Sequence, residues 1–473
     1  MHKQIAQDRI VVPFAGADAG TAPLTWGQKA ILRDMQDNGS QFTMTGTMPL
    51  PPGSTVAAAA ARLSGLIGQH AALRTRLSRG PGDRQYQAVD GSGQVSLDVL
   101  TIPDGADQAD IARYVDDLQV TWPLVPFDFH RDWPLRMAVL RHRGACLRLA
   151  WVLSHLIADG AAHLLLLADL IAGETAGGAA SRPGRQQILD IARDEQEPRL
   201  RQLSSRAMRY WESQLRDIPA LTFGEPAGPP GDSGQPGESG QRHAKVRFSS
   251  TAAHLAILAI ARRTGTDVSR VTLAVIATAI GRATGMSRLT VNVMVNNRFR
   301  PGLADVIAPI AQNSVVTIDV ADASIDHVVR QARAAALTAG MRAYYDPDEL
   351  AEVITRLDAE RGFPARVSCR INDQRAMIRS TDDEAGQRDV TLRQVRQRLT
   401  QTSLTWLGPM DHLHDQASFI VENLPDVVSL YLMCDLRCFT TGQVEALLRG
   451  VEEVAVEAAF DPVASTRISG GDS

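Results

Sequence analysis

Large apolar side chains alternate with smaller or polar ones along several short segments of the chain. Residues 146–154 read CLRLAWVLS and place Trp151 and Leu153, together with the leucines before them, on one face. This alternation is typical of a half-buried strand. Residues 288–296 (RLTVNVMVN) and 313–320 (NSVVTIDV) are equally short and rich in β-branched residues, so they also predict strands.

Apolar residues recur at helical spacing in other segments of the chain. The segments with this pattern are residues 54–70, 108–121, 161–173, 186–215, 249–265 and 268–285. Because strand and helix signals interleave, the pattern predicts an α/β (α+β) protein with mixed layers. No internal repeat of fixed period is visible.

The length of 473 residues exceeds what one hydrophobic core usually holds. We therefore expect two lobes, residues 1–176 and 177–473, separated by the glycine-rich stretch that follows the helix at 161–173. Residues 224–241 (GEPAGPPGDSGQPGESGQ) exclude a packed element by composition and predict a disordered loop within the second lobe.

The segment SHLIADG, residues 154–160, connects the strand at 146–154 to the helix that follows. Its His155 is the side chain there that exchanges a proton near neutral pH. Asp159 is placed to cap the following helix or to bind an arginine, and Gly160 leaves room for a close approach. Taken alone the pattern is weak, because buried histidines and Asp-Gly turns are common.

Composition narrows the classes of partner and compartment. The net charge of −4 at pH 7 provides no basic field for nucleic acid. No apolar run is long enough for a membrane span, and the first residues lack the pattern of a signal peptide, so we expect a cytoplasmic protein. Four cysteines in so long a chain do not form a disulfide framework.

Other histidines suggest little chemistry. His163 falls on the helix after the turn and is expected to pack. His412 and His414 form an H-x-H pattern beside Asp411 and Asp415, but no third ligand set accompanies them, so we expect no metal site.

SHLIADG resembles the H-H-x-x-x-D-G signature of condensation domains of nonribosomal peptide synthetases, within the chloramphenicol-acetyltransferase-like acyltransferase superfamily. Further landmarks of that family occur in the same order. They are PLTWGQKAIL (23–32), HAALRTRL (70–77), FDFHRDWPLRMAVL (127–140), YWESQL (210–215), and VNVMVNNRFR with APIAQNSVVTIDV (291–320). The resemblance implies two acetyltransferase-like lobes that form a V, with a central tunnel and His155 at its middle.

The resemblance also implies roles for residues of the turn. His155 is the expected catalytic residue, acting either as the base that takes a proton or as an acceptor that positions the nucleophile. Asp159 is expected to support the site structurally by pairing with Arg298 across the two lobes. Gly160 is expected to border the donor arm.

Two positions depart from the family pattern. Ser154 stands where the family has its first histidine, so its hydroxyl either helps to hold an oxyanion or is an ordinary strand-end serine. Asn313 is the expected asparagine of the later motif and is expected to face the tunnel. The glycine that usually precedes that asparagine is absent, and Pro309 lies nearby.

The activity implied is that of a free-standing, monomeric condensation enzyme that joins a carrier-bound acyl or aminoacyl thioester to an amine. The phosphopantetheine arm would come from an acyl or peptidyl carrier protein, the amine would be free or carrier-bound, and the chain itself would bind no cofactor. Two alternatives stay open. One is an ester-forming or coenzyme A-dependent acyltransferase of the same superfamily, and the other is a non-catalytic module that recruits a carrier protein.

Overall fold

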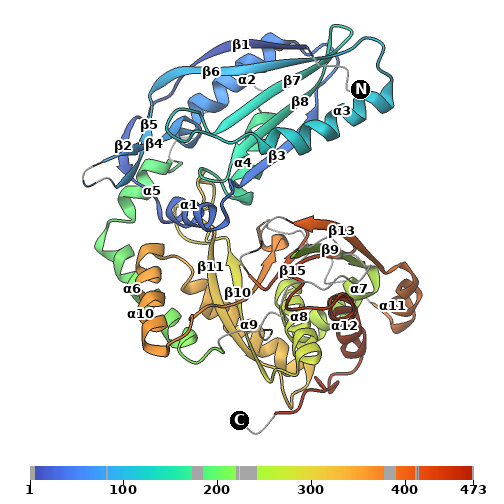
Figure 1. The fold of residues 1–473 in the computed structure, drawn as a ribbon. Coiled ribbons are helices and arrows are strands. Elements are labelled where there is room, and N and C mark those ends of the chain that lie inside the picture. The colour runs from blue at the N-terminus through green and yellow to red at the C-terminus, as the bar shows by residue number, and fades with distance from the viewer. Residues whose placement is uncertain are drawn as a thin grey trace. The chain divides into compact units, whose positions relative to one another are not determined.

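The computed structural model (Figure 1) describes residues 6–80, 82, 84–172, 185–219, 223, 242–377, 390–410, 413 and 415–470. The chain divides into two compact units. Unit 1 comprises Met1–Arg201 and Asn297–Ala311, and unit 2 comprises Gln202–Asn296 and Gln312–Ser473. Both are mixed α/β structures, as the sequence predicts. Among the described residues, no helix is both long and apolar enough to cross a membrane.

Unit 1 is built on a five-stranded sheet of order β1-β6-β7-β8-β3, in which only β6 and β7 run parallel. These strands are β1 (Ala6–Ala15), β3 (Thr43–Pro49), β6 (Ser92–Ile102), β7 (Leu135–His142) and β8 (Ala145–Ser154). A smaller sheet has the order β2 (Gly20–Pro23), β5 (Gln85–Val89) and β4 (Thr75–Arg79). The predicted strand at 146–154 is confirmed as β8.

Helices cover both faces of the larger sheet in unit 1. α2 (Val56–Gln69) and α4 (Gly160–Ala172) pack on the face that carries Trp151 and Leu153. α3 (Gln108–Thr121) packs on the opposite face, with Leu140 and Ala150. Because both faces are covered, β8 is buried along most of its length. The remaining elements of the unit are α1 (Trp26–Asn38), η1 (Ala71–Arg74), η3 (Trp122–Leu124) and α5 (Ile188–Asp194).

Unit 2 contains a seven-stranded sheet of order β11-β10-β12-β14-β15-β9-β13. These strands are β9 (His243–Ser250), β10 (Arg288–Val295), β11 (Gln312–Asp319), β12 (Cys369–Asp373), β13 (Ser403–Met410), β14 (Ala417–Val421) and β15 (Val428–Asp435). The helices are α6 (Pro198–Leu215, which begins in unit 1), α7 (Thr251–Thr264), α8 (Val268–Thr284), α9 (Ile325–Met341), α10 (Pro347–Arg361), α11 (Leu392–Arg398) and α12 (Thr441–Ala459), with the short turns η4 (Gln374–Met377) and η7 (Leu399–Gln401).

The alternation of residues along β11 assigns the two faces of this sheet. Val316 and Ile318 point into the main core with α7, α8, α9 and α12. Val315 points the other way, into a second core with α6 and α10. The predicted strands at 288–296 and 313–320 are confirmed as β10 and β11.

The predicted helix at 186–215 is instead two helices, α5 and α6. The second begins at Pro198, which lacks the amide hydrogen that a continuous helix would need and is favoured at a first helical turn.

The division of the chain differs from the predicted boundary at residue 176. α5 stays with unit 1 because Gln187 Oε1 accepts from the Ala71 amide at 3.0 Å and Glu195 Oε2 accepts from the Trp26 amide at 2.8 Å. Unit 1 also takes Asn297–Ala311, which lie between β10 and β11 in the sequence. The predicted loop at 224–241 lies outside the described residues.

Candidate functional site

The segment SHLIADG forms the turn between the end of β8 and the start of α4. The Ser154 amide donates to the Pro134 carbonyl at 2.9 Å, and the His155 amide donates to the Phe42 carbonyl at 2.9 Å. Gly160 is the first residue of α4. Backbone bonds to two neighbouring segments therefore fix the position of His155.

Asp159 is buried, at 2% exposure, and both of its carboxylate oxygens are occupied. Oδ1 accepts from the Ala162 amide at 2.8 Å and from Arg298 Nη2 at 2.7 Å. Oδ2 accepts from the Ile310 and Ala311 amides at 3.1 and 3.0 Å. The residue thus caps α4 and also binds an arginine, so the two alternatives raised by the sequence occur together.

The Asp159–Arg298 pair lies within unit 1. The sequence predicted a pair across two lobes, but residues 297–311 pack with unit 1 after leaving β10. Arg298 Nη1 also donates to the Val306 carbonyl at 2.8 Å. Asn297 Nδ2 donates to the Ile310 carbonyl at 2.9 Å. The segment is therefore folded back on itself around the guanidinium of Arg298.

Gly27 of α1 allows this segment to approach closely. A Cβ atom built on Gly27 would lie 1.4 Å from the Pro309 carbonyl oxygen, a distance that no side chain tolerates. The sequence analysis included Gly27 in the motif PLTWGQKAIL (23–32) but gave it no role. Its contact joins residues 282 positions apart, for which a single sequence offers no local signal.

The imidazole of His155 is held in its neutral form by its surroundings. Burial lowers the pKa of His155, against the opposing effects of its own backbone and of the Asp159 and Asp34 carboxylates. Nδ1 is buried and forms no hydrogen bond of good geometry with the described residues. A neutral imidazole is the form that can accept a proton or a hydrogen bond.

Ser154 is fully buried and braces the turn. Its Oγ accepts from the Leu156 amide at 3.2 Å. This contact gives the hydroxyl a structural role at the end of the strand, and its role toward an oxyanion stays a prediction.

Asn313 lies in unit 2, on β11, whereas the other predicted site residues lie together in unit 1. Its Oδ1 is buried with no hydrogen-bond partner among the described residues, and the same holds for Oδ1 of Asn292 and of Asn372. The strand register puts Asn313 opposite Met294, with Asn292 two residues along the same strand as Met294, and Asn372 on the next strand. Sequence reasoning missed the other two asparagines.

The motif HAALRTRL is architectural. Arg74 is fully buried, and its guanidinium donates to the carbonyls of Ile67 (3.0 Å), Asp18 (2.6 Å) and Asp90. The buried His70 places Nε2 3.1 Å from an Asp169 oxygen.

Asp169 completes this buried cluster by accepting from Arg185 Nη1 at 2.8 Å. The hydrogen bond with His70, together with the Arg185 charge, lowers the pKa of Asp169 to about 2. Burial lowers the pKa of His70 despite its carboxylate neighbour. These contacts tie η1 to α4 and therefore hold the helix that follows the turn.

Gln28 is architectural as well. Its Oε1 accepts from the Thr25 amide at 2.9 Å, and its own amide donates to Thr25 Oγ1 at 3.1 Å. This reciprocal pair is a capping box that begins α1.

Among the described residues, no group of three or more histidine, cysteine or acidic side chains is arranged to hold a metal ion. His412 and His414 lie outside the described residues. Cys146, Cys369 and Cys434 are buried free thiols, and Cys438 is a half-buried one.

Comparison with known proteins supplies a family match. A family model described as the condensation domain matches residues 18–397. Phosphinothricin tripeptide synthetase PhsC of Streptomyces viridochromogenes is 25% identical over 323 residues, which are 65% of this chain and 28% of PhsC. CymA of Salinispora arenicola, described as a probable nonribosomal peptide synthetase, is 25% identical over 296 residues, or 59% of this chain and 4% of CymA. The chain thus spans only a part of either relative.

Solved structures share the fold at low identity. One was solved in a study of condensation domain-mediated chain release from the enacyloxin polyketide synthase, with a TM-score of 0.70, 18% identity and coverage of 95% of this chain and 85% of that chain. The X-domain in complex with OxyB from teicoplanin biosynthesis has a TM-score of 0.65 and 18% identity, and the match covers 96% of this chain and 97% of that chain. SgcC5 of Streptomyces globisporus was solved in complex with (R)-(-)-1-(2-naphthyl)-1,2-ethanediol and sucrose. It has a TM-score of 0.67 and 17% identity, and the match covers 94% of this chain and 100% of that chain.

Proposed function

The chain belongs to the condensation-domain family, and on that premise we propose that it joins a carrier-bound acyl or aminoacyl thioester to an amine. The observation that carries the proposal is the position of the His155 imidazole, at the end of β8 in a turn whose Asp159 accepts from three backbone amides and from Arg298. Such fixing favours catalysis by orientation, which provides much of the rate advantage of a site that aligns two reactants.

The reaction needs little chemistry beyond alignment and one proton transfer. The amine nitrogen attacks the thioester carbonyl, the carbon–sulfur bond breaks, and the thiol leaves with a proton. His155 acts as the base that removes the proton of the amine, or as the acceptor that orients the amine, and its lowered pKa suits either role. Because a thioester is already activated, no covalent enzyme intermediate is required.

The roles of the neighbouring residues follow from their contacts. Asp159 and Arg298 position the turn and do not touch the reactants. Gly160, at the start of α4, borders the phosphopantetheine arm. Asn313 contacts the substrate through its Oδ1, which is a hydrogen-bond acceptor.

The partners in this proposal are those that the family resemblance implies. An acyl or peptidyl carrier protein supplies the phosphopantetheine arm, the amine is free or carrier-bound, and the chain binds no cofactor of its own. In this proposal it acts as a monomer in the cytoplasm. PhsC and CymA are named as peptide synthetases, and this supports a role for the chain in peptide synthesis on carrier proteins.

Product analysis tests the proposal. The purified chain is incubated with a carrier protein loaded with an acyl or aminoacyl thioester and with amine acceptors, and products are identified by mass spectrometry. Amide product from the wild-type chain and its loss in His155→Ala are expected. Amide formation at the wild-type rate in His155→Ala would contradict the role of the imidazole.

Ester formation is the second candidate, because SgcC5 was solved with a diol bound and a neutral imidazole serves a hydroxyl nucleophile equally well. The same assay with alcohol acceptors, and with coenzyme A thioesters in place of loaded carrier protein, separates this candidate from amide formation.

Recruitment without chemistry is the third candidate. The X-domain was solved in complex with OxyB, and Ser154 replaces a histidine of the family signature. Carrier-protein binding that is unchanged in His155→Ala, with no product from any donor, would favour this candidate.

A further inference from the structure

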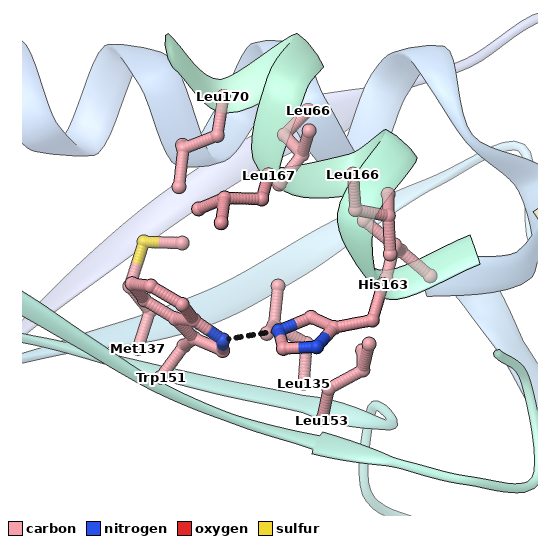
Figure 2. A pocket seen from close by; sticks show the side chains of 10 residues that line it. Leu66, Leu135, Met137, Trp151, Leu153, His163, Leu166, Leu167 and Leu170 are labelled. Carbon is pink, nitrogen blue, oxygen red and sulfur yellow. Dashed lines mark hydrogen bonds between the residues drawn. The ribbon is translucent and has the colours of Figure 1, made fainter. Parts of the chain in front are cut away.

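A groove in unit 2 differs in size and chemistry from the small void in the core of unit 1. The void, between α4 and the sheet, measures about 20 Å³, and in its wall Trp151 Nε1 donates to His163 Nε2 at 2.9 Å (Figure 2). Such a volume holds about one water molecule at most, so the void is a feature of packing. The groove measures about 450 Å³, which falls within the usual range of ligand sites.

The groove follows the outer edge of β11. This strand begins the sheet order and has β10 beside it (Figure 1), and within the described ranges no other strand pairs with it. α6 packs on one face of the sheet and α9 on the other, so the edge lies between the two helices. Each of these elements lines the groove: Tyr210 and Ser213 from α6, Ala334 and Thr338 from α9, and Thr290 and Thr317 from the two strands.

Thr317 presents unpaired backbone groups at this edge. In an antiparallel pair, alternate residues direct both the N–H and the C=O away from the partner strand. The Tyr210 hydroxyl donates to the Val315 carbonyl at 2.7 Å, and the Asp319 amide donates to Gln331 Oε1 at 3.2 Å, so residues 315, 317 and 319 are the outward set. Among the described residues, the N–H and C=O of Thr317 have no hydrogen-bond partner. An open position therefore lies between two that side chains have closed.

The hydroxyl groups of the groove are already bonded within its walls. Those of Thr290 and Thr317 bond to each other at 2.9 Å. The Ser213 hydroxyl donates to the Tyr210 carbonyl at 2.8 Å, and the Thr338 hydroxyl donates to the carbonyl one turn before it at 3.1 Å. A hydroxyl-rich ligand such as a sugar would compete with these bonds, whereas a peptide backbone would pair with Thr317 without breaking any of them.

One end of the groove is acidic. Arg288 Nε donates to Asp319 Oδ1 at 2.5 Å, and Asp217, which lines the groove, lies near the same guanidinium. The hydrogen bond with Asp319, together with the charges of Asp319 and Asp217, raises the pKa of Arg288. Because two carboxylates surround one guanidinium, this end has a net negative charge and complements a cationic side chain.

We propose that the groove binds an extended peptide segment of a partner protein, which adds a short strand to the edge of β11 by pairing with Thr317. Val315 and Asp319 are four positions apart, or roughly 13 Å along a strand, so about four residues of the segment lie in the groove. The segment carries a lysine or arginine at the acidic end. In this mode of recognition the main-chain hydrogen bonds provide affinity and the side chains provide specificity.

Selection of peptides with a matched pair of variants tests the proposal. A phage-displayed library of random heptapeptides is selected on the immobilised wild-type chain, and the enriched sequences are synthesised with a fluorescein label for anisotropy measurements. Thr338→Trp fills the groove. Thr355→Trp is the control, because Thr355 of α10 is also an exposed helical threonine whose hydroxyl donates to the carbonyl one turn before it, but it does not line the groove.

The enriched peptides are expected to contain a basic residue and to bind Thr338→Trp about 10-fold or more weakly than the wild-type chain, with less than about a 2-fold change in Thr355→Trp. Asp217→Asn keeps the volume of the groove and is expected to weaken the same peptides about 3-fold by removing one carboxylate. Failure of the wild-type chain to enrich any peptide would overturn the proposal. Unchanged affinity in both Thr338→Trp and Asp217→Asn, with circular dichroism showing that they fold, would also overturn it.

N-methylation of the selected peptides distinguishes strand pairing from binding by side chains alone. A methyl group on a nitrogen that pairs with Thr317 removes a hydrogen bond, whereas the neighbouring nitrogens point away from β11. Affinity is therefore expected to fall at alternate positions of the peptide. Equal loss at adjacent positions, or no loss at any position, would overturn strand addition.

The test is independent of the function proposed above. His155 lies in unit 1, and peptide binding requires no turnover. The His155→Ala chain is expected to bind the selected peptides with wild-type affinity. Binding with the expected N-methylation pattern supports the groove even if no product forms from any donor, and its absence overturns the groove even if the enzyme is active.

Discussion

Arg298 donates to Asp159 at 2.7 Å across 139 positions of sequence, and both side chains are almost fully buried. The same carboxylate receives three backbone amides. The pair therefore fixes the beginning of α4 and the returning segment 297–311 at once, and the position of His155 depends on it.

Asp159→Asn is predicted to destabilise the chain by about 2–4 kcal/mol, because it leaves the buried Arg298 without its counterion. Urea denaturation measures the change. The control is Asp319→Asn, which removes the exposed pair of Asp319 with Arg288 and should change the free energy of unfolding by less than about 1 kcal/mol. Equal effects of the two substitutions would refute the buried pair as an anchor.

Gly27→Ala is predicted to destabilise unit 1 and to lower activity, because the new methyl group would overlap the Pro309 carbonyl. The displaced segment, which precedes β11, carries the Ile310 and Ala311 amides that donate to Asp159 Oδ2. Gly442→Ala, at the start of α12 with no atom near the new methyl group, is the control and should be neutral or stabilising by up to about 1 kcal/mol. Thermal denaturation of both variants checks the difference.

The Asp159–Arg298 contact could be predicted from the sequence, whereas the contact of Gly27 with Pro309 could not. The turn at 154–160 follows from local alternation, and the Asp159–Arg298 contact was expected from the family resemblance. The approach of Gly27 to Pro309 and the membership of residues 297–311 in unit 1 could not be predicted, because they depend on packing between distant segments. The break between α5 and α6 at Pro198 was missed although the proline was visible, since the apolar spacing continues on both sides of it.

Buried amides in unit 2 give a paired prediction. Asn292 Oδ1 has no hydrogen-bond partner among the described residues, so Asn292→Leu is expected to change stability by less than about 1 kcal/mol. The Gln312 side chain accepts from the amide of Tyr345 at 3.2 Å and donates to its carbonyl at 2.9 Å. Gln312→Leu removes both hydrogen bonds from buried groups and should therefore lower the free energy of unfolding by about 2–4 kcal/mol. Urea denaturation distinguishes them, and a larger loss in Asn292→Leu would contradict the assignment.

Stability is predicted to fall as the pH drops below about 6.5. Burial lowers the pKa of His70, His155 and His163 below their ordinary value of 6.5. Between the folded pKa and 6.5 the unfolded chain binds more protons than the folded chain. The free energy of unfolding therefore rises with pH through that window and levels off above it.

Urea denaturation between pH 5 and pH 8 checks this dependence. Replacing a buried titrating ring by an amide should flatten it, so His155→Gln is expected to show a smaller slope than the wild-type chain below pH 6.5. A slope of opposite sign, with stability rising as the pH falls, would show that these rings are charged in the folded chain.

The most direct test of the account is the single-turnover rate of amide formation from a loaded carrier protein, measured for the wild-type chain and for His155→Ala at pH 7. The account predicts a fall of roughly 10²- to 10⁴-fold, the usual contribution of a positioned proton acceptor, with carrier-protein binding and Tm unchanged. A His155→Ala chain that forms amide as fast as the wild type would contradict it.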